Sequence, residues 1–322
     1  MKTKKHLFTL LAAMMLLPTA CSSESIKQEI DNGIDYLQSM KDIEEPGEEG
    51  KVITKTYQLK DFDRIDASFA FDIDYTQGED YLVKMTGTEA LLDRIEVTVE
   101  GGTLIMKNKK HNRRTNGKIH VVLTAPRLNS IDNSGALTFR TQNLNADNFS
   151  ISNSGALKWI SGNVDCTTLN IHNSGASNIK GNFRAAGNAD VSNSGQMTLV
   201  GNVTSKKLLT YENSGADKHE GNLQSGEMTM KNSGASEWNT KVTTDNLTIK
   251  SSGATTATMT FKGGALTMTN SGSGKMNIHC DCKRLFVKNS GVSNIKFTGT
   301  ADDAELKSSG IAKINSEELN RY

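Results

Sequence analysis

Residues 189–215 read ADVSNSGQMTLVGNVTSKKLLTYENSG and contain two copies of the tripeptide Asn-Ser-Gly, twenty residues apart. This tripeptide, or Ser-Ser-Gly, occurs ten times in the chain, at four intervals of 20 residues and then five of 19. Self-similarity at a fixed period of this length indicates a repeat protein. We interpret the last residue of each copy as a structural turn glycine: Gly135, Gly155, Gly175, Gly195, Gly215, Gly234, Gly253, Gly272, Gly291 and Gly310.

The flanks of the tripeptide are apolar at alternate positions. Four residues before the motif glycine, every copy carries an apolar or aromatic residue, from Ile131 to Leu306. The positions six before, four after and eight after are mostly apolar too. Alternation by two predicts strands with one inward face, and recurrence in every repeat predicts stacked rows of like side chains. The predicted fold is all-β: a single-stranded parallel β-helix solenoid of about ten coils of 19–20 residues.

The motif itself predicts a bend between two strands of one coil. Glycine suits a sharp turn, and we expect a positive φ there. Asparagines stacked coil upon coil can form an amide ladder, and the coils should lie ~4.8 Å apart. The helix should be right-handed, as parallel crossovers nearly always are. No proline follows Pro126, which suits a continuous strand ladder.

The N-terminus reads as a targeting segment. Residues 1–20 combine a basic start with an apolar run too short to cross a bilayer, which indicates a signal peptide. Small residues lead directly into Cys21, as in bacterial lipoproteins, so Cys21 is the predicted lipid attachment site; secretion with a chance cysteine is the alternative. Residues 21–50 are strongly acidic and read as a lipidated tether.

Residues 51–127 lack the tripeptide but alternate like strands. Strands are expected at residues 69–75, 81–85, 95–99, 104–106 and 119–123, with a helical turn at residues 89–93. We interpret this region as an N-terminal β cap that shields the first coil of the repeats, which span residues 128–322. The pattern leaves open whether the cap stacks as extra coils or packs separately.

Three segments and the repeats together resemble a known family. These are residues 62–67 (FDRIDA), the pair Leu91-Leu92, residues 125–128 (APRL) and the succeeding Asn-Ser-Gly copies. They resemble the putative auto-transporter adhesin, head GIN domain family over about residues 52–315. The resemblance implies a β-helix protein of the Gram-negative cell envelope, and it brings no catalytic or ligand residues with it.

Enzymatic and metal chemistry find little support. Asp147, Asp245 and Asp302 share one coil position, but lie five and then three coils apart, too far to form a site. No catalytic residue, metal site or cofactor is predicted. The cysteines of Cys280-Asp281-Cys282 fit inward rows as small apolar side chains, and Cys166 lies coils away from both.

Two inward polar residues of one coil, Tyr211 and His219, are expected to hydrogen-bond to each other across the core. A basic loop includes Lys107, Lys109, Lys110, His111, Arg113 and Arg114. It could contact anionic glycan or lipopolysaccharide, or be only a solvated loop. The balanced net charge of +1 gives no reason to expect nucleic acid.

The positions five and three before the motif glycine face outward, and in the later coils they are rich in threonine and lysine. We hypothesise that these residues form a ligand face for an extended anionic glycan; strand propensity and avoidance of edge pairing are the plainer explanation of the same pattern. The ligand face consists of Thr229, Lys231, Thr248, Lys250, Thr267, Lys288 and Lys307.

The function predicted from the sequence is a non-enzymatic cell-surface lipoprotein, an adhesive or glycan-binding module displayed on the outer membrane. Its expected partners are the membrane, through the N-terminal lipid, and an anionic glycan or envelope surface. The alternatives are a purely structural envelope protein and, less favoured, a polysaccharide-acting β-helix enzyme.

Overall fold

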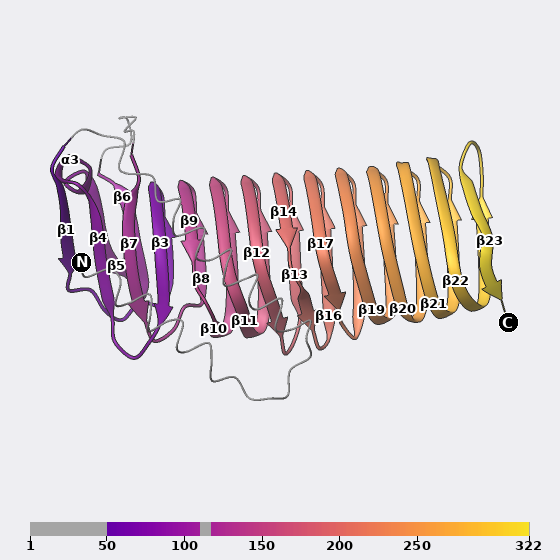
Figure 1. Ribbon diagram of the computed structural model, residues 1–322, viewed down its shortest axis with the longest axis horizontal. Coiled ribbons are helices and arrows are strands. Elements are labelled where there is room, and N and C mark those ends of the chain that lie inside the picture. The colour runs from indigo at the N-terminus through magenta and orange to yellow at the C-terminus, as the bar shows by residue number, and fades with distance from the viewer. Residues whose placement is uncertain (1–49, 110–116, 322) are drawn as a thin grey trace, which may run out of the picture. The chain divides into compact units, whose positions relative to one another are not determined.

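The computed structural model describes residues 50–109 and 117–321. The signal peptide, Cys21, the tether up to residue 49 and the loop residues Lys110 to Arg114 lie outside the described residues. Within them, the strands form one hydrogen-bonded sheet that winds along the solenoid axis (Figure 1). None of the helices found in this part of the chain is long and apolar enough to cross a membrane.

The described residues form strands and one short helix, and buried and exposed residues alternate along the strands as the period-2 pattern predicts. Their bounds, in chain order, are β1 (Val52–Tyr57), β2 (Arg64–Ala67), β3 (Ala70–Gln77), β4 (Leu82–Thr88), α3 (Glu89–Leu92), β5 (Ile95–Glu100), β6 (Thr103–Asn108), β7 (Ile119–Ala125), β8 (Ser130–Asn133), β9 (Ala136–Arg140), β10 (Leu144–Asn153), β11 (Ala156–Asn173), β12 (Ala176–Ala185), β13 (Ala189–Asn193), β14 (Gln196–Val200), β15 (Val203–Ser205), β16 (Leu208–Asn213), β17 (Ala216–Gln224), β18 (Glu227–Asn232), β19 (Ala235–Ser251), β20 (Ala254–Asn270), β21 (Ser273–Asn289), β22 (Val292–Ser308) and β23 (Lys313–Arg321).

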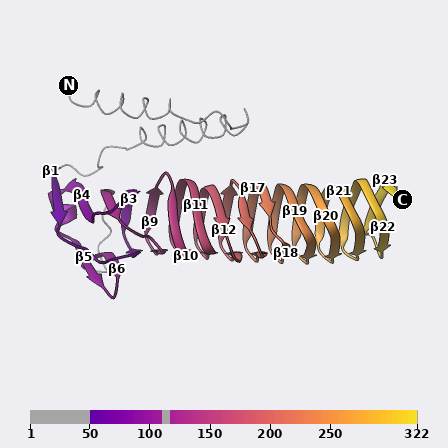
Figure 2. The same ribbon diagram turned by 90° about the horizontal axis from the view of Figure 1, so that it is seen from below.

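The parallel β-helix predicted from the repeats is confirmed. Each strand from β8 onward pairs in parallel with its counterpart one coil later, for example β19 with β20 and β20 with β21. Equivalent positions are register partners, so that Ile249 stands beside Met268 and then Val287. Figure 2 shows the same succession of coils in a view turned by 90°, from β9 to β23.

The stacked rows form the core. Four positions before the motif glycine, Ile131, Ile151, Val191 and Tyr211 are at most 1% exposed. Four positions after it, Phe139 and Trp159 stack face to face with ring centroids 4.6 Å apart. In the following coils Ile179 and Leu199 continue this row, so each coil is stabilised mainly by its two neighbours.

The N-terminal region contains the expected strands and helical turn, and its sheet is continuous with the repeats. β2 and β3 pair in parallel with β8 and β9 and so form one more coil. β6 and β7 pair in parallel with β2 and β3 and stack beyond that coil. β1, β4 and β5 then add antiparallel strands at this end.

The expectation of positive φ at the motif glycines is wrong for all of them but Gly310. These glycines are required by the adjacent coil instead. A Cβ added at Gly215 would lie less than 3.0 Å from the carbonyl oxygen of Gly195, and each motif glycine from Gly155 to Gly291 meets the previous motif glycine in the same way. Close backbone approach therefore selects glycine at this position.

The predicted amide ladder is present and buried. The Nδ2 atom of Asn153 donates to Oδ1 of Asn173 in the next coil at 2.7 Å, and also to the carbonyl of Gly155 in its own bend. The same coil-to-coil bond runs from Asn133 to Asn232. Each asparagine thus fixes its own bend and ties it to the next.

The ladder is interrupted where one coil has Ser251 instead of asparagine. The hydroxyl of Ser251 bonds to that of Thr255, and Asn232 donates to Thr255 rather than along the ladder. On the other side of the gap, Oδ1 of Asn270 is buried without a hydrogen-bond partner among the described residues. A buried amide oxygen left unpaired lowers stability.

Replacing Ser251 with asparagine is expected to raise the free energy of unfolding by about 1 kcal/mol, because the new amide can donate to Oδ1 of Asn270. Ser252→Asn is the matched control, since Ser252 is exposed and its variant should melt like the wild type. Denaturant titration of both variants measures the difference. A Ser251→Asn protein no more stable than the control would show that the gap has no energetic cost.

Positive φ occurs at a second corner of the coil. Gly201 and Gly221 have φ values of 139° and 141°, and each precedes an asparagine. Asn202 donates from Nδ2 to Oδ1 of Asn182 in the previous coil at 2.8 Å. In the sequence this corner is marked by a recurring Gly-Asn pair, which is separate from the Asn-Ser-Gly motif.

Candidate functional site

The predicted ligand-face residues lie in two neighbouring columns that run along the axis. Thr229, Thr248 and Thr267 are register partners on β18, β19 and β20. Lys231 and Lys250 are register partners two residues further along the same strands. Lys288 and Lys307 occupy the same position on β21 and β22. All seven residues therefore share one outward surface of the sheet.

The four lysines of the ligand face differ in their ion pairs. Lys231 contacts Glu212 of the preceding coil at 2.6 Å, and Lys307 contacts Glu305 of its own strand at 2.5 Å. Within the described part of the chain, no ion pair involves Lys250 or Lys288. The two pairs are half-exposed, so each is worth at most about 1 kcal/mol and leaves its lysine available to a ligand.

The same columns become acidic toward the N-terminal coils. Asp66 and Asp132 are register partners on β2 and β8. Burial, and then the neighbouring charge of Asp66, raise the pKa of Asp132. Burial, and then Glu212, raise the pKa of Asp190. The outward surface thus carries carboxylates in its early coils and lysines in its later ones.

A groove of about 560 Å³ runs beside the lysine column. One wall carries His172, Ser192, Glu212, Lys231, Lys250 and Thr269, which lie three residues before the motif glycine. The other wall, here called the serine row, consists of the exposed Ser194, Ser214, Ser233, Ser252 and Ser271 of the motifs. The groove includes Lys231 and Lys250 of the ligand face, but none of its threonines.

The predicted bond between Tyr211 and His219 is wrong. Their rings lie 5.7 Å apart, and the Tyr211 hydroxyl donates to Oδ1 of Asp217 at 2.9 Å. Oδ2 of Asp217 accepts the indole N–H of Trp238 at 3.3 Å. Burial raises the pKa of Asp217 to about 6 and lowers that of His219 to about 4. Alternation places the rings of Tyr211 and Trp238 inward but does not reveal the carboxylate of Asp217 that joins them.

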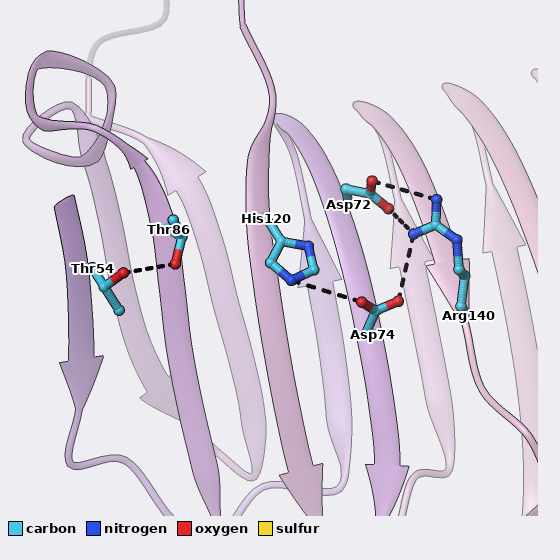
Figure 3. Close-up of polar contacts among 6 residues, drawn as sticks. All are labelled: Thr54, Asp72, Asp74, Thr86, His120 and Arg140. Carbon is cyan, nitrogen blue, oxygen red and sulfur yellow. Dashed lines mark hydrogen bonds and ion pairs between the residues drawn. The ribbon is translucent and has the colours of Figure 1, made fainter. Parts of the chain in front are cut away.

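A second polar network lies across β7, β3 and β9 (Figure 3). The guanidinium of Arg140, 3% exposed, forms an ion pair with Asp72 and contacts Oδ1 of Asp74 at 3.5 Å. Nε2 of His120 lies 3.7 Å from the other oxygen of Asp74. Burial raises the pKa of Asp74 above its usual range. The network joins three successive layers of the N-terminal end, which suits a structural role.

The cysteines occupy inward rows, as predicted. Cys166, Cys280 and Cys282 are buried and free. Burial raises the pKa of Cys166 to about 11, so its thiol is a poor nucleophile. Over the described residues, no group of three or more His, Cys, Asp or Glu side chains is arranged to hold a metal ion.

Comparison with known proteins gives one family. The model of the family described as "Putative auto-transporter adhesin, head GIN domain" matches residues 61–243 and 245–321. No curated protein matches the chain.

Several solved structures are similar to the described fold. A putative adhesin from Bacteroides fragilis NCTC 9343 is 23% identical, with a TM-score of 0.40, over 77% of this chain and 97% of that one. A putative adhesin from Parabacteroides merdae ATCC 43184 is 17% identical, with a TM-score of 0.46, over 83% and 96%. A putative lipid binding protein from Parabacteroides distasonis ATCC 8503 is 18% identical, with a TM-score of 0.40, over 83% and 97%.

Proposed function

Because the chain belongs to the putative auto-transporter adhesin, head GIN domain family, we propose that it is a non-enzymatic adhesive module of the cell envelope. In this proposal the ligand is an extended anionic glycan, bound along the lysine column of the ligand face. The N-terminal lipid on Cys21 holds the protein on the outer membrane.

The observation that carries the proposal is the stacking of lysines at one strand position. Lys231 and Lys250 are direct register partners, as are Lys288 and Lys307. Like charges on adjacent strands repel, and the cost is screened but not removed by salt. A polyanion laid along the axis would relieve this repulsion and would find hydroxyls of threonine and serine beside the charges.

Replacing Lys231, Lys250, Lys288 and Lys307 together with glutamine is expected to abolish binding to sulfated or uronic-acid glycans without lowering stability. All four side chains are exposed, so their loss leaves the core intact. Wild-type binding should also weaken steeply with salt, because it rests on charge. A glycan array followed by titration calorimetry at several salt concentrations measures both effects.

The matched control replaces Lys158, Lys241, Lys262 and Lys275, which are exposed and outside the ligand face, with glutamine. It changes the net charge equally, so it should retain binding if position matters. Equal losses of glycan binding in both variants would show that binding depends on net charge alone. A wild-type protein that binds no anionic glycan would leave the purely structural envelope role as the better account.

Cys21→Ala is expected to release the protein from the membrane fraction or to stall its processing, because the predicted lipid is attached through the thiol of this residue. Metabolic labelling with a radioactive fatty acid measures the modification directly. Ser22→Ala is the control and should keep the label. A wild-type protein that takes up no label would contradict the anchor.

A further inference from the structure

The groove offers a deeper site for an extended polymer than the threonine column does. Each wall is built from one equivalent position in successive coils, so the groove follows the solenoid axis. A chain lying in it contacts both walls, whereas a chain on the open sheet contacts one surface. Burial on two sides gives more contact per length of polymer.

The hydroxyls of the serine row are available to a ligand. Ser233 is exposed, and its Oγ donates to the carbonyl of Asn213 at 3.5 Å, the long limit of a hydrogen bond. Ser214 bonds to Asn193 in the same way at 3.4 Å. Such weak bonds are readily exchanged for stronger ones to a charged acceptor, such as a sulfate or carboxylate oxygen.

Charge divides the groove at one step. Glu212 is the register partner of Lys231, which is in turn the partner of Lys250. Before Glu212 the same wall carries Ser192 and His172, so Glu212 is the one carboxylate among the described residues that line the groove. An anionic chain bound at Lys231 and Lys250 therefore meets repulsion at Glu212.

We propose that the groove, rather than the threonine column, is the glycan site, with Lys231 and Lys250 on one wall and Ser233 and Ser252 on the other, and that Glu212 limits the anionic segment that it accepts. This inference rests on the proposed function and locates the proposed glycan in the groove. Glu212 acts as a specificity-determining residue, because its carboxylate competes with the ligand for Lys231 and repels further anionic groups.

The first test compares the serine row with the threonine column. Its probes are dextran sulfate and oligogalacturonate of graded length, and binding is measured by titration calorimetry. Ser233→Ala with Ser252→Ala is expected to weaken binding about tenfold. Thr229→Val with Thr248→Val, the matched pair on the open sheet, should stay within about twofold. Ser233→Leu, which fills the groove at an exposed position, should abolish binding, and unchanged melting temperatures exclude misfolding.

The limiting carboxylate is tested with Glu212→Gln, which is expected to strengthen binding about fivefold at low salt and to extend the longest oligomer accepted. Glu237→Gln is the control, since Glu237 also pairs with a lysine, Lys218, but lies outside the groove. Suppose that the serine pair, Ser233→Leu and Glu212→Gln all leave the affinity unchanged while the quadruple lysine variant still loses binding. That result would overturn the groove as the glycan site but not the proposed function. No binding by the wild type to any probe would overturn the proposed function itself.

Discussion

Gly215→Ala is expected to lower the free energy of unfolding by about 3 kcal/mol, because the new methyl group would meet backbone rather than a movable side chain. The carbonyl of Gly195, which it would meet, accepts a hydrogen bond from the N–H of Ala216 at 2.8 Å. The two coils can separate only if bonds of this kind stretch. Denaturant unfolding followed by circular dichroism measures the loss.

Gly310→Ala is the informative control, because it separates the two reasons for a glycine. Gly310 has a φ of 71°, and nothing lies within 4 Å of a Cβ added there. Its substitution should cost about 1 kcal/mol through backbone strain alone. A Gly215→Ala protein no less stable than Gly310→Ala would contradict the role given to close coil stacking.

The buried pair Asp217 and His219 is expected to give opposite pH dependences that nearly cancel in the wild type. Asp217 has its pKa raised to about 6 on folding, so its stabilisation is present at low pH and is lost as pH rises toward 6. His219 has its pKa lowered to about 4, so the folded state prefers the neutral ring and gains stability as pH rises from 4 to its unfolded value.

Single substitutions should reveal the pH dependence of each residue separately. His219→Leu is expected to lose stability between pH 4 and 6, and Asp217→Asn to gain stability from pH 4 to about 6.5. Each change is about 3 kcal/mol, since one pKa unit corresponds to about 1.4 kcal/mol. The measurement is the unfolding free energy of both variants and the wild type across this range. Parallel curves of unfolding free energy against pH for all three proteins would contradict the pKa shifts assigned to Asp217 and His219.

The sequence predicted the core rows well, because alternation and period together fix which side chains face inward. It did not show why glycine recurs: a positive φ and a close backbone approach select the same residue. It left open whether the N-terminal region stacks as extra coils, and the structure shows that β2 and β3 form one. There Ala67 and Phe69 stand at the asparagine and glycine positions, and Ala136 bonds to the carbonyl of Phe69 as Ala156 does to Gly135.

The candidate site was predictable only in part. The lysine column follows from spacing alone, and the structure places its members on adjacent strands. The groove depends on how far the bend at the motif stands from the strand surface, which no residue pattern encodes. The role of Asp217 was not predictable either, because the position two after the motif glycine is apolar in Leu157 and Met197 but polar in Ser236 and Thr255.

The gap in the amide ladder at Ser251 has a mechanical consequence. A tensile force between β8 and β23 passes through every intervening coil interface in series, because each coil touches only its neighbours. The interfaces on either side of Ser251 lack the asparagine-to-asparagine bond that those from Asn133 to Asn232 share. Under load these interfaces should yield before those from Asn133 to Asn232, so that the coils after residue 251 unravel while those before it stay wound.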